Sequence, residues 1–202
     1  TENGEAVTAE TVFTPETPNG TVTVSFTFDS RLMKENTSLV VFETLYKDGK
    51  ELAVHADIED EDQTVKVTVP KIGTKATVNG EKSATAKGDI TIKDTVSYKN
   101  LTVGKEYTVK GILMNKETGK PFLVNGKEVT SKVTFTAEKK DGEITVRFTF
   151  DGSKVTKQTD IVVFETLYRD GVEIAAHADI KDDGQTVTLT PPAPPVPQTG
   201  DN

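Results

Sequence analysis

The sequence repeats itself at one constant spacing. The segment VVFETLY at 40–46 returns at 162–168, and FTFD at 26–29 returns at 148–151, an offset of 122 residues in both cases. The same offset carries residues 3–69 onto 125–191 without a gap. A unit of about 120 residues has the size of one immunoglobulin-like sandwich. The chain is therefore predicted to hold one complete unit and part of another.

The composition favours strands throughout both units. Thr and Val dominate, Gly and Pro form short clusters, and long Ala/Leu/Glu stretches are missing. We expect an all-β fold, a tandem array of immunoglobulin-like β-sandwiches: a partial unit at 1–69, a complete unit at 70–190 and a Pro-rich linker at 191–202. The partial unit would leave a sheet face and edge exposed, which indicates a fragment boundary.

Charge and cysteine content exclude several classes of protein. The 202 residues carry a net charge of −8 and no basic patch, so binding to nucleic acid or anionic membranes is not expected. There is no Cys, so covalent reinforcement cannot come from disulfides. No apolar run is long enough for a membrane span, and residues 1–20 do not resemble a signal peptide, so targeting segments of a secreted protein would lie outside this sequence.

Polar side chains occupy apolar faces of the predicted strands. Period-two alternation places Asp94 in one row with Ile90, Ile92, Val96 and Tyr98. Glu165 takes the same kind of position among Ile161, Val163 and Leu167, and Glu43 repeats it in the partial unit. In the first predicted strand of the complete unit Thr74 points inward and Thr77 does not, and in the last strand Gln185 shares a face with Val187 and Leu189.

Together these residues form a candidate reactive set. Two close, buried carboxyls retain protons, and a protonated carboxyl can donate to the Gln185 carbonyl and make its carbon more electrophilic. A Thr hydroxyl could then attack that carbon if a base removed its proton. The two histidines, His55 and His177, each precede a Gln by eight residues and are candidate bases. Taken singly, each residue could instead be a satisfied core hydroxyl, a loop cap or an inert surface histidine.

The complete unit resembles the VaFE repeats, or Thr-Gln ester-bond domains, of Gram-positive surface adhesins. The resemblance extends over the whole unit and rests on IGTKAT at 72–77, IKDTVSYKNLTVGKEYTVKGILMNKETGKP at 92–121, VVFETLY at 162–168 and AHADIKDDGQTV at 176–187. It implies an intramolecular ester between a Thr of the first strand and a Gln of the last, with release of ammonia.

Carried over to this sequence, the resemblance implies Thr74 as nucleophile, Gln185 as acyl donor, His177 as base, and Asp94 with Glu165 as the carboxyl pair. Simple alternation, however, puts His177 on the outward face, so a bulge near Ala175 or an entry from the solvent side is required. Thr77 remains a weaker alternative nucleophile. The partial unit retains Glu43, His55 and Gln63 without the Thr and Asp strands, and a separate polypeptide that supplied those strands could cross-link to Gln63.

The tail carries a second resemblance. Val196, Pro197, Gln198, Thr199 and Gly200 are similar to the sortase signal LPxTG with Val in place of Leu, which implies cleavage after Thr199 and attachment to cell-wall peptidoglycan. An ordinary Pro-rich linker is the alternative.

We therefore expect a stalk segment of a wall-anchored, extracellular surface adhesin, with neighbouring repeats, peptidoglycan and an unknown host or surface ligand as partners. The alternatives are a ligand-binding adhesin module and an isopeptide-type pilin domain. No cofactor, metal site or turnover activity is expected, because both reacting groups belong to one chain and react once. A calcium site is disfavoured because Lys181 and Gly184 stand in the complete unit opposite two members of the acidic run Asp57, Glu59, Asp60, Glu61 and Asp62.

Overall fold

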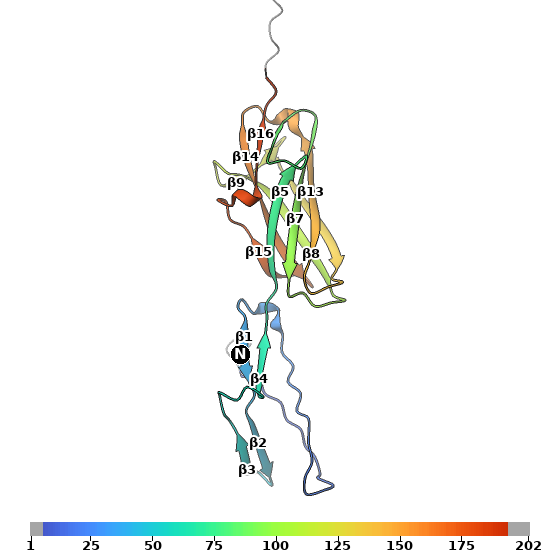
Figure 1. Ribbon diagram of the computed structural model, residues 1–202, viewed down its shortest axis with the longest axis vertical. Coiled ribbons are helices and arrows are strands. Elements are labelled where there is room, and N and C mark those ends of the chain that lie inside the picture. Colours follow the sequence, from blue (N-terminus) through green and yellow to red (C-terminus); the bar gives the residue numbers. More distant parts are fainter. Residues whose placement is uncertain (1–5, 194–202) are drawn as a thin grey trace, which may run out of the picture. The chain divides into compact units, whose positions relative to one another are not determined.

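A computed structural model describes residues 6–193 of the chain. The chain divides into two compact units between Val69 and Pro70, and each is described by itself (Figure 1). Both units consist of strands joined by turns, with three short 3-10 turns among the described residues, and every strand pair is antiparallel except the parallel pair of β6 and β16 in the second unit. No helix in the described part is long and apolar enough to cross a membrane.

The second unit is a sandwich of two sheets. The smaller sheet has the order β13-β7-β5, and the larger has the order β12-β8-β14-β16-β6, with β15 and β9 added at β14 and β8. The strands of the smaller sheet are β5 (Lys71–Val78), β7 (Asp89–Lys99) and β13 (Gly142–Asp151). Those of the larger sheet are β6 (Ser83–Thr85), β8 (Glu106–Asn115), β9 (Lys120–Pro121), β12 (Thr130–Thr136), β14 (Thr159–Arg169), β15 (Val172–His177) and β16 (Thr186–Thr190). A two-residue hairpin, β10 (Leu123–Val124) with β11 (Lys127–Glu128), completes the unit.

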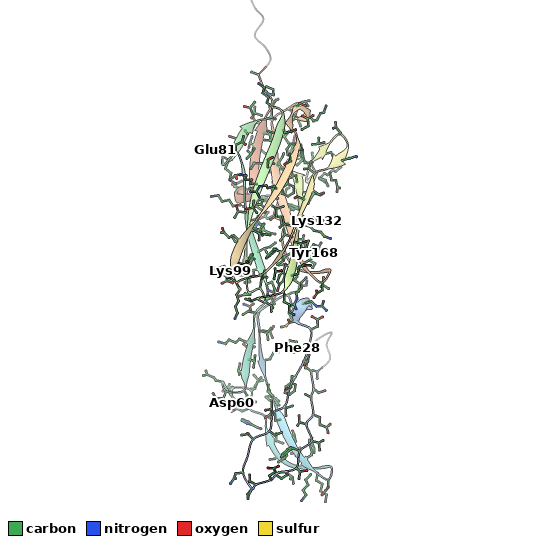
Figure 2. The ribbon with its side chains drawn as sticks, turned by 90° about the vertical axis from the view of Figure 1, so that its right-hand side faces the viewer. Phe28, Asp60, Glu81, Lys99, Lys132 and Tyr168 are labelled. Atoms are coloured by element: carbon green, nitrogen blue, oxygen red, sulfur yellow. The ribbon has the colours of Figure 1, made fainter. Side chains whose placement is uncertain are left out.

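Buried and exposed residues alternate along the strands as the sequence predicts. Along β7 every second residue is buried, and Ile92 and Val96 have no exposed surface. The facing rows of β8 and β14 contribute Leu113 and Val163, which are equally buried. Because each fully buried aliphatic side chain contributes about 1.5–3 kcal/mol, the sandwich has a strong apolar core even though the sequence is polar on average. Figure 2 draws the side chains on the ribbon, with Lys99 at the end of β7 and Lys132 of β12 labelled.

Strand β14 has two different neighbours along one edge. Its first half pairs with β16 and its second half with β15, while β8 pairs along the other edge. The turn between β15 and β16 contains the 3-10 turn η3 (Asp183–Gln185). The chain therefore leaves the sheet at His177 and returns at Thr186, and this opening in the edge of the sheet is where the predicted site residues gather.

The first unit contains four short strands. Strand β1 (Thr37–Val40) pairs with β4 (Thr64–Val67), and β2 (Glu43–Lys47) pairs with β3 (Lys50–His55). In β2 and β3 every residue is exposed. Asp48-Gly49 and Asp170-Gly171 lie between the strands of two hairpins, and all four residues have positive φ, as a type I′ turn requires.

Candidate functional site

Thr74 and Gln185 meet between the two sheets. Thr74 lies in β5, the edge strand of the smaller sheet, opposite the buried Val96 of β7, so its side chain points inward. Gln185 is fully buried at the end of η3, immediately before β16 rather than within it as predicted. Its Nε2 donates a hydrogen bond to Thr74 Oγ1, and the two residues are 111 positions apart in sequence. Thr77, the alternative nucleophile, lies opposite Lys93 on the other face of the strand.

The two predicted carboxyls are enclosed in the core beside this contact. Asp94 has no exposed surface and Glu165 retains 1%. None of their four oxygens forms a hydrogen bond of good geometry within the described residues, and the same holds for Oε1 of Gln185. The carboxyl-to-amide hydrogen bond expected from the sequence is therefore not formed in this structure. Buried polar atoms without partners are rare in folded proteins and concentrate at functional sites.

Burial sets the protonation of the carboxyl pair. Removal from water raises the pKa of Asp94. It also raises the pKa of Glu165 to about 10, with the neighbouring Asp94 carboxyl adding to the effect by hydrogen bonding and by repulsion. The two carboxyls lie close enough to shift each other's pKa, although no hydrogen bond of good geometry joins them. Glu165 therefore holds a proton at neutral pH.

A glycine makes room for this pair. Gly111 of β8 lies directly opposite Glu165 of β14. A Cβ placed there would clash with the Phe148 ring and lie 3.3 Å from Glu165 Oε1. The strand can therefore bring a carboxyl and an aromatic ring together only because position 111 has no side chain.

His177 reaches the inward face through a β-bulge. Leu167 pairs with Ala175 and Tyr168 with Glu173, so Ile174 has no partner and the alternation shifts by one. Downstream of the bulge, His177 is the direct partner of Glu165 and shares its face. The bulge required by the sequence is therefore present, one residue before Ala175.

The structure adds Asp182, which the sequence interpretation did not include. Its Oδ2 lies 2.7 Å from Nε2 of His177. This hydrogen bond lowers the pKa of Asp182, so the carboxylate is charged beside the imidazole. A carboxylate on one imidazole nitrogen fixes the ring orientation and the tautomer, as in hydrolase triads. The signal was available, because both repeats contain a His followed five residues later by an Asp.

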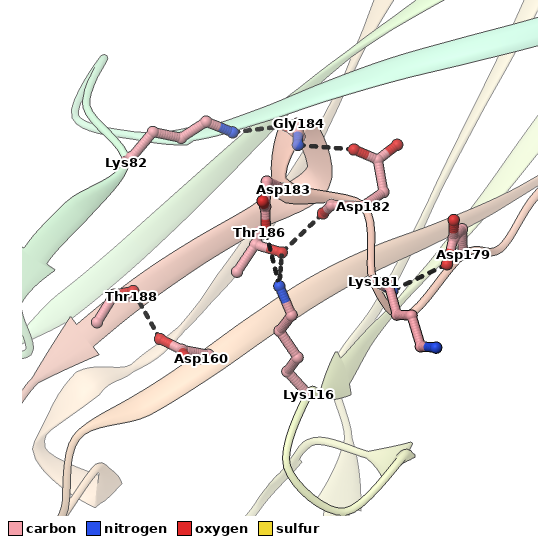
Figure 3. A network of polar contacts seen from close by, with 10 residues as sticks. All are labelled: Lys82, Lys116, Asp160, Asp179, Lys181, Asp182, Asp183, Gly184, Thr186 and Thr188. Atoms are coloured by element: carbon pink, nitrogen blue, oxygen red, sulfur yellow. Dashed lines mark hydrogen bonds and ion pairs between the residues drawn. The ribbon is translucent and has the colours of Figure 1, made fainter.

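Lysine and aspartate side chains hold the turn that carries Gln185 (Figure 3). Asp182 Oδ1 accepts the Gly184 N–H at 2.6 Å, and its carbonyl accepts the Thr186 hydroxyl at 2.7 Å. Lys82 Nζ donates to the Gly184 carbonyl at 2.5 Å and to the Ala76 carbonyl of β5 at 2.7 Å. Lys82 therefore ties the Thr74 strand to the Gln185 turn, and burial lowers its pKa.

The partial unit preserves half of this arrangement. Glu43 is the direct partner of His55 across the same kind of bulge, and His55 Nε2 lies 2.8 Å from Asp60 Oδ2 (Asp60 is labelled in Figure 2). Gln63 follows in the equivalent place. No counterpart of Thr74 or Asp94 lies in residues 6–69.

Two further predictions concern other parts of the chain. The sortase-like residues 196–200 lie outside the described residues. Asp57 and Asp60 of the acidic run use carboxylate oxygens to accept backbone N–H groups of Glu59 and Asp62 in their own turn. Within residues 6–193, no group of three or more His, Asp or Glu side chains is arranged to hold a metal ion.

Known structures similar to this chain include a bacterial adhesin from Mobiluncus mulieris that contains intramolecular disulfide, isopeptide and ester bond cross-links. Two crystal forms of that adhesin match with TM-scores of 0.54 and 0.52, both at 22% identity, covering 62% of this chain and 58% of the adhesin. This chain thus spans less than two thirds of the adhesin's length, and at this identity the likeness concerns the fold. No curated protein matches the sequence.

The family comparison is more specific. The family model of the T-Q ester bond containing domain matches twice, at residues 1–67 and at residues 70–189. The two matches follow the division of the chain at Val69 and the repeat offset. The chain belongs to the family of T-Q ester bond containing domains.

Proposed function

We propose that the second unit closes an ester between Thr74 and Gln185 and serves as a covalently locked segment of a surface-protein shaft. The observation that carries the proposal is the contact between Thr74 Oγ1 and Nε2 of the fully buried Gln185. The oxygen lies against the nitrogen that it would replace on Cδ of Gln185. The coupled carboxyls and the His177–Asp182 pair belong to the strands and turn around this contact.

The proposed reaction is an acyl transfer within one chain. His177, oriented by Asp182, accepts the hydroxyl proton as Thr74 Oγ1 attacks Cδ of Gln185. Protonated Glu165 stabilises the negative charge that develops on Oε1, which is buried without another donor. The C–N bond then breaks, the proton moves from His177 to the leaving nitrogen, and ammonia departs. The reaction occurs once, so no turnover follows.

The surroundings favour an ester over the isopeptide alternative. An isopeptide needs a lysine amine facing a carboxyl or amide carbon. Two lysines bind the Gln185 turn, and both donate elsewhere: Lys82 to two backbone carbonyls, and Lys116 to side-chain oxygens of Asp183 and Thr186. The group that faces the Gln185 amide is a hydroxyl.

Placement of the bond explains its use in a shaft. Thr74 lies three residues after the start of β5, and Gln185 lies five residues before the end of β16. Tension applied at the two ends of the unit would pass through the ester, and the residues between would carry none. Mechanical locking, rather than ligand binding, is what a bond from the first strand to the residue just before the last strand provides.

The wider organisation belongs to the same proposal. The partial unit, the complete unit and the Pro-rich linker would form part of an extracellular shaft with neighbouring repeats. The VPQTG segment at 196–200 would serve sortase attachment to peptidoglycan through Thr199. Any host or surface ligand would bind elsewhere in the full protein.

Intact-mass spectrometry tests the cross-link. The wild-type chain is expected to weigh one ammonia less than its sequence, Thr74→Ala is expected to have its full sequence mass, and Thr77→Ala is expected to lose ammonia as wild type does. Hydroxylamine cleaves esters and spares isopeptides, so treatment of the denatured wild-type chain should convert Gln185 to a hydroxamate and reopen the link. A full-mass wild-type chain, or a link that resists hydroxylamine, would reject the ester.

A further inference from the structure

One lysine side chain joins the two backbone segments that carry the reacting residues. Lys82 lies in the connection between β5 and β6, and its Nζ donates to the Ala76 carbonyl at 2.7 Å and to the Gly184 carbonyl at 2.5 Å. Ala76 stands two residues after Thr74 in β5, and Gly184 directly precedes Gln185. Figure 3 shows the Lys82 side chain extended toward the Gly184 peptide. A single cation therefore bridges the backbone beside the nucleophile and the backbone beside the acyl donor.

The backbone of Lys82 is held by the strands around it. Its carbonyl accepts the N–H of Thr188 in β16 at 2.8 Å. Just before it, Val78 and Glu81 exchange two backbone hydrogen bonds of 2.8 and 3.0 Å, which close the turn after β5. Because the side chain starts from this fixed backbone, its ammonium forms a defined link between the two segments.

The link crosses a gap in the backbone pairing. Strand β5 pairs with β7 along one edge only, so the carbonyls along its other edge need other partners. The Gly184 peptide passes beside that edge, since a Cβ on Gly184 would lie 3.9 Å from the Thr74 carbonyl oxygen. Within residues 70–190, the hydrogen bonds that connect β5 to η3 are those through the Lys82 ammonium and the Thr74–Gln185 contact itself.

These two connections behave differently in the proposed reaction. The Thr74–Gln185 hydrogen bond is consumed, because the hydroxyl gives up its proton and Nε2 leaves as ammonia. The bonds of Lys82 end on backbone carbonyls that take no part in the reaction. They persist from the open chain to the ester, so they can hold Oγ1 of Thr74 against Cδ of Gln185 while the bonds are exchanged.

The second lysine at this turn is placed differently. Lys116 follows β8 and donates to Asp183 Oδ1 at 2.9 Å and to Thr186 Oγ1 at 3.2 Å. Strands β8 and β16 belong to the same sheet, so Lys116 steadies the turn on its own sheet. Of these two lysines, Lys82 is the one that reaches from the turn to the smaller sheet. Hydrogen bonds from an ammonium are roughly twice as strong as those from a neutral donor, so the charge is part of this link.

We propose that Lys82 is a positioning residue for ester formation, whose ammonium holds the Thr74 strand and the Gln185 turn at attack distance until the bond has closed. Its hydrogen bonds within the described residues reach backbone carbonyls and not the reacting atoms, so it acts through the backbone on either side of them. The proposal rests on the ester proposed for the second unit. It adds to that reaction a residue that lies outside the hydroxyl, amide, imidazole and carboxyl groups of the site.

The absence of cysteine from the chain allows a direct test of the ammonium. Lys82→Cys, produced as inclusion bodies and dissolved in urea, is alkylated either with 2-bromoethylamine or with iodoacetamide. The first reagent restores an ammonium at the end of a side chain with as many chain atoms as lysine, and the second leaves a shorter, neutral amide. Ester closure starts on dilution from urea and is followed by intact-mass spectrometry as the loss of one ammonia over time.

Wild type and the aminoethylated chain should close at similar rates, because both carry the ammonium that joins β5 to the turn. The amide-modified chain should close about 10²-fold more slowly, as expected when reacting groups are displaced by about 1 Å. Lys87→Cys is the matched control, since Lys87 is an exposed lysine beyond β6. This control chain should close at the wild-type rate with either reagent.

A second measurement separates positioning from stability of the fold. Thr74→Ala is combined with Lys82→Cys, and circular dichroism gives the folded fraction of each alkylated chain that cannot close. Both measurements are made in sucrose, which favours the folded state. The closure rate divided by the folded fraction should still differ about 10²-fold between the two alkylated forms.

Each other outcome decides against one of the two proposals. Equal corrected rates for the two alkylated forms would overturn the positioning role, whether both were fast or both slow, because the ammonium would then make no difference. A wild-type chain that keeps its full mass would reject the ester itself. A wild-type chain that closes no faster than the amide-modified Lys82→Cys chain would reject the role of Lys82 alone.

Discussion

Replacing Thr74 by Ala should remove most of the stability that the cross-link gives to the second unit. The bond would close a loop between residues 111 positions apart. Loop-closure entropy for that length corresponds to about 5 kcal/mol at 25 °C. With an unfolding entropy of about 2.1 cal/mol/K per residue over a unit of about 120 residues, this lowers Tm by roughly 20 °C.

The assay is thermal unfolding of the full chain followed by circular dichroism, with calorimetry to identify the transition of the second unit. Thr77→Ala is the matched control, since it removes the same atoms from the outward face of the same strand. It should cost no more than about 1 kcal/mol. Thr74→Ser keeps a hydroxyl and should retain both the ammonia loss and the high Tm. A Thr74→Ala variant that melts within a few degrees of Thr77→Ala would refute the loop-closure reasoning.

Three further predictions concern the site and the mechanics. In the uncross-linked Thr74→Ala chain, stability should fall as pH rises from 5 to 8, because the raised pKa of Glu165 makes the folded state bind a proton that the unfolded state has released. The slope is at most about 1.4 kcal/mol per pH unit for one proton, and urea midpoints should show it shrink with Glu165→Gln; a slope unchanged by that substitution would count against a protonated Glu165. Asp182→Asn should slow ester formation by a factor of about 10² or more, seen as ammonia loss over time during refolding, whereas Asp183→Asn should not. In single-molecule pulling, Thr74→Ala should release roughly 380 Å of chain that wild type never releases, because the linked residues are 111 positions apart; equal extension of the two proteins would exclude a locked unit.

The sequence predicted the inward position of the candidate residues better than it predicted the local backbone around them. Asp94 and Glu165 belong to long, regular strands, so period-two alternation alone placed them correctly in the core. Thr74 was placed correctly for the same reason. Burial of one face of a regular strand fixes which alternate side chains point inward.

The rest of the site depends on irregular backbone, to which alternation does not apply. The bulge at Ile174 reverses the face of His177, and a bulge has no composition signal strong enough to place it to the residue. Gln185 ends a 3-10 turn instead of opening a strand, because the Asp182 carboxylate caps the turn before the sheet resumes. Asp182 stands among other acidic residues, and only the equivalent Asp60 of the first unit distinguishes it in the sequence.

The partial unit shows how much of a strand depends on its neighbours. Residues 37–47 contain the whole VVFETLY motif of β14, and yet they form two strands, β1 and β2, with no strand paired to them in the place that β8 takes beside β14. Strand propensity was thus sufficient to locate the segment, but not to predict the break.

Peptide mapping tests the central claim most directly. Trypsin should cut the denatured chain after Lys71, Lys75 and Lys181, leaving Ile72–Lys75 with Thr74 and residues 182–202 with Gln185. The ester predicts one branched species that contains both peptides and weighs one ammonia less than the sum of the two separate peptide masses. Its fragment ions should place the branch at Thr74 and Gln185. Recovery of the two peptides separately at their full masses from the folded wild-type protein would contradict it.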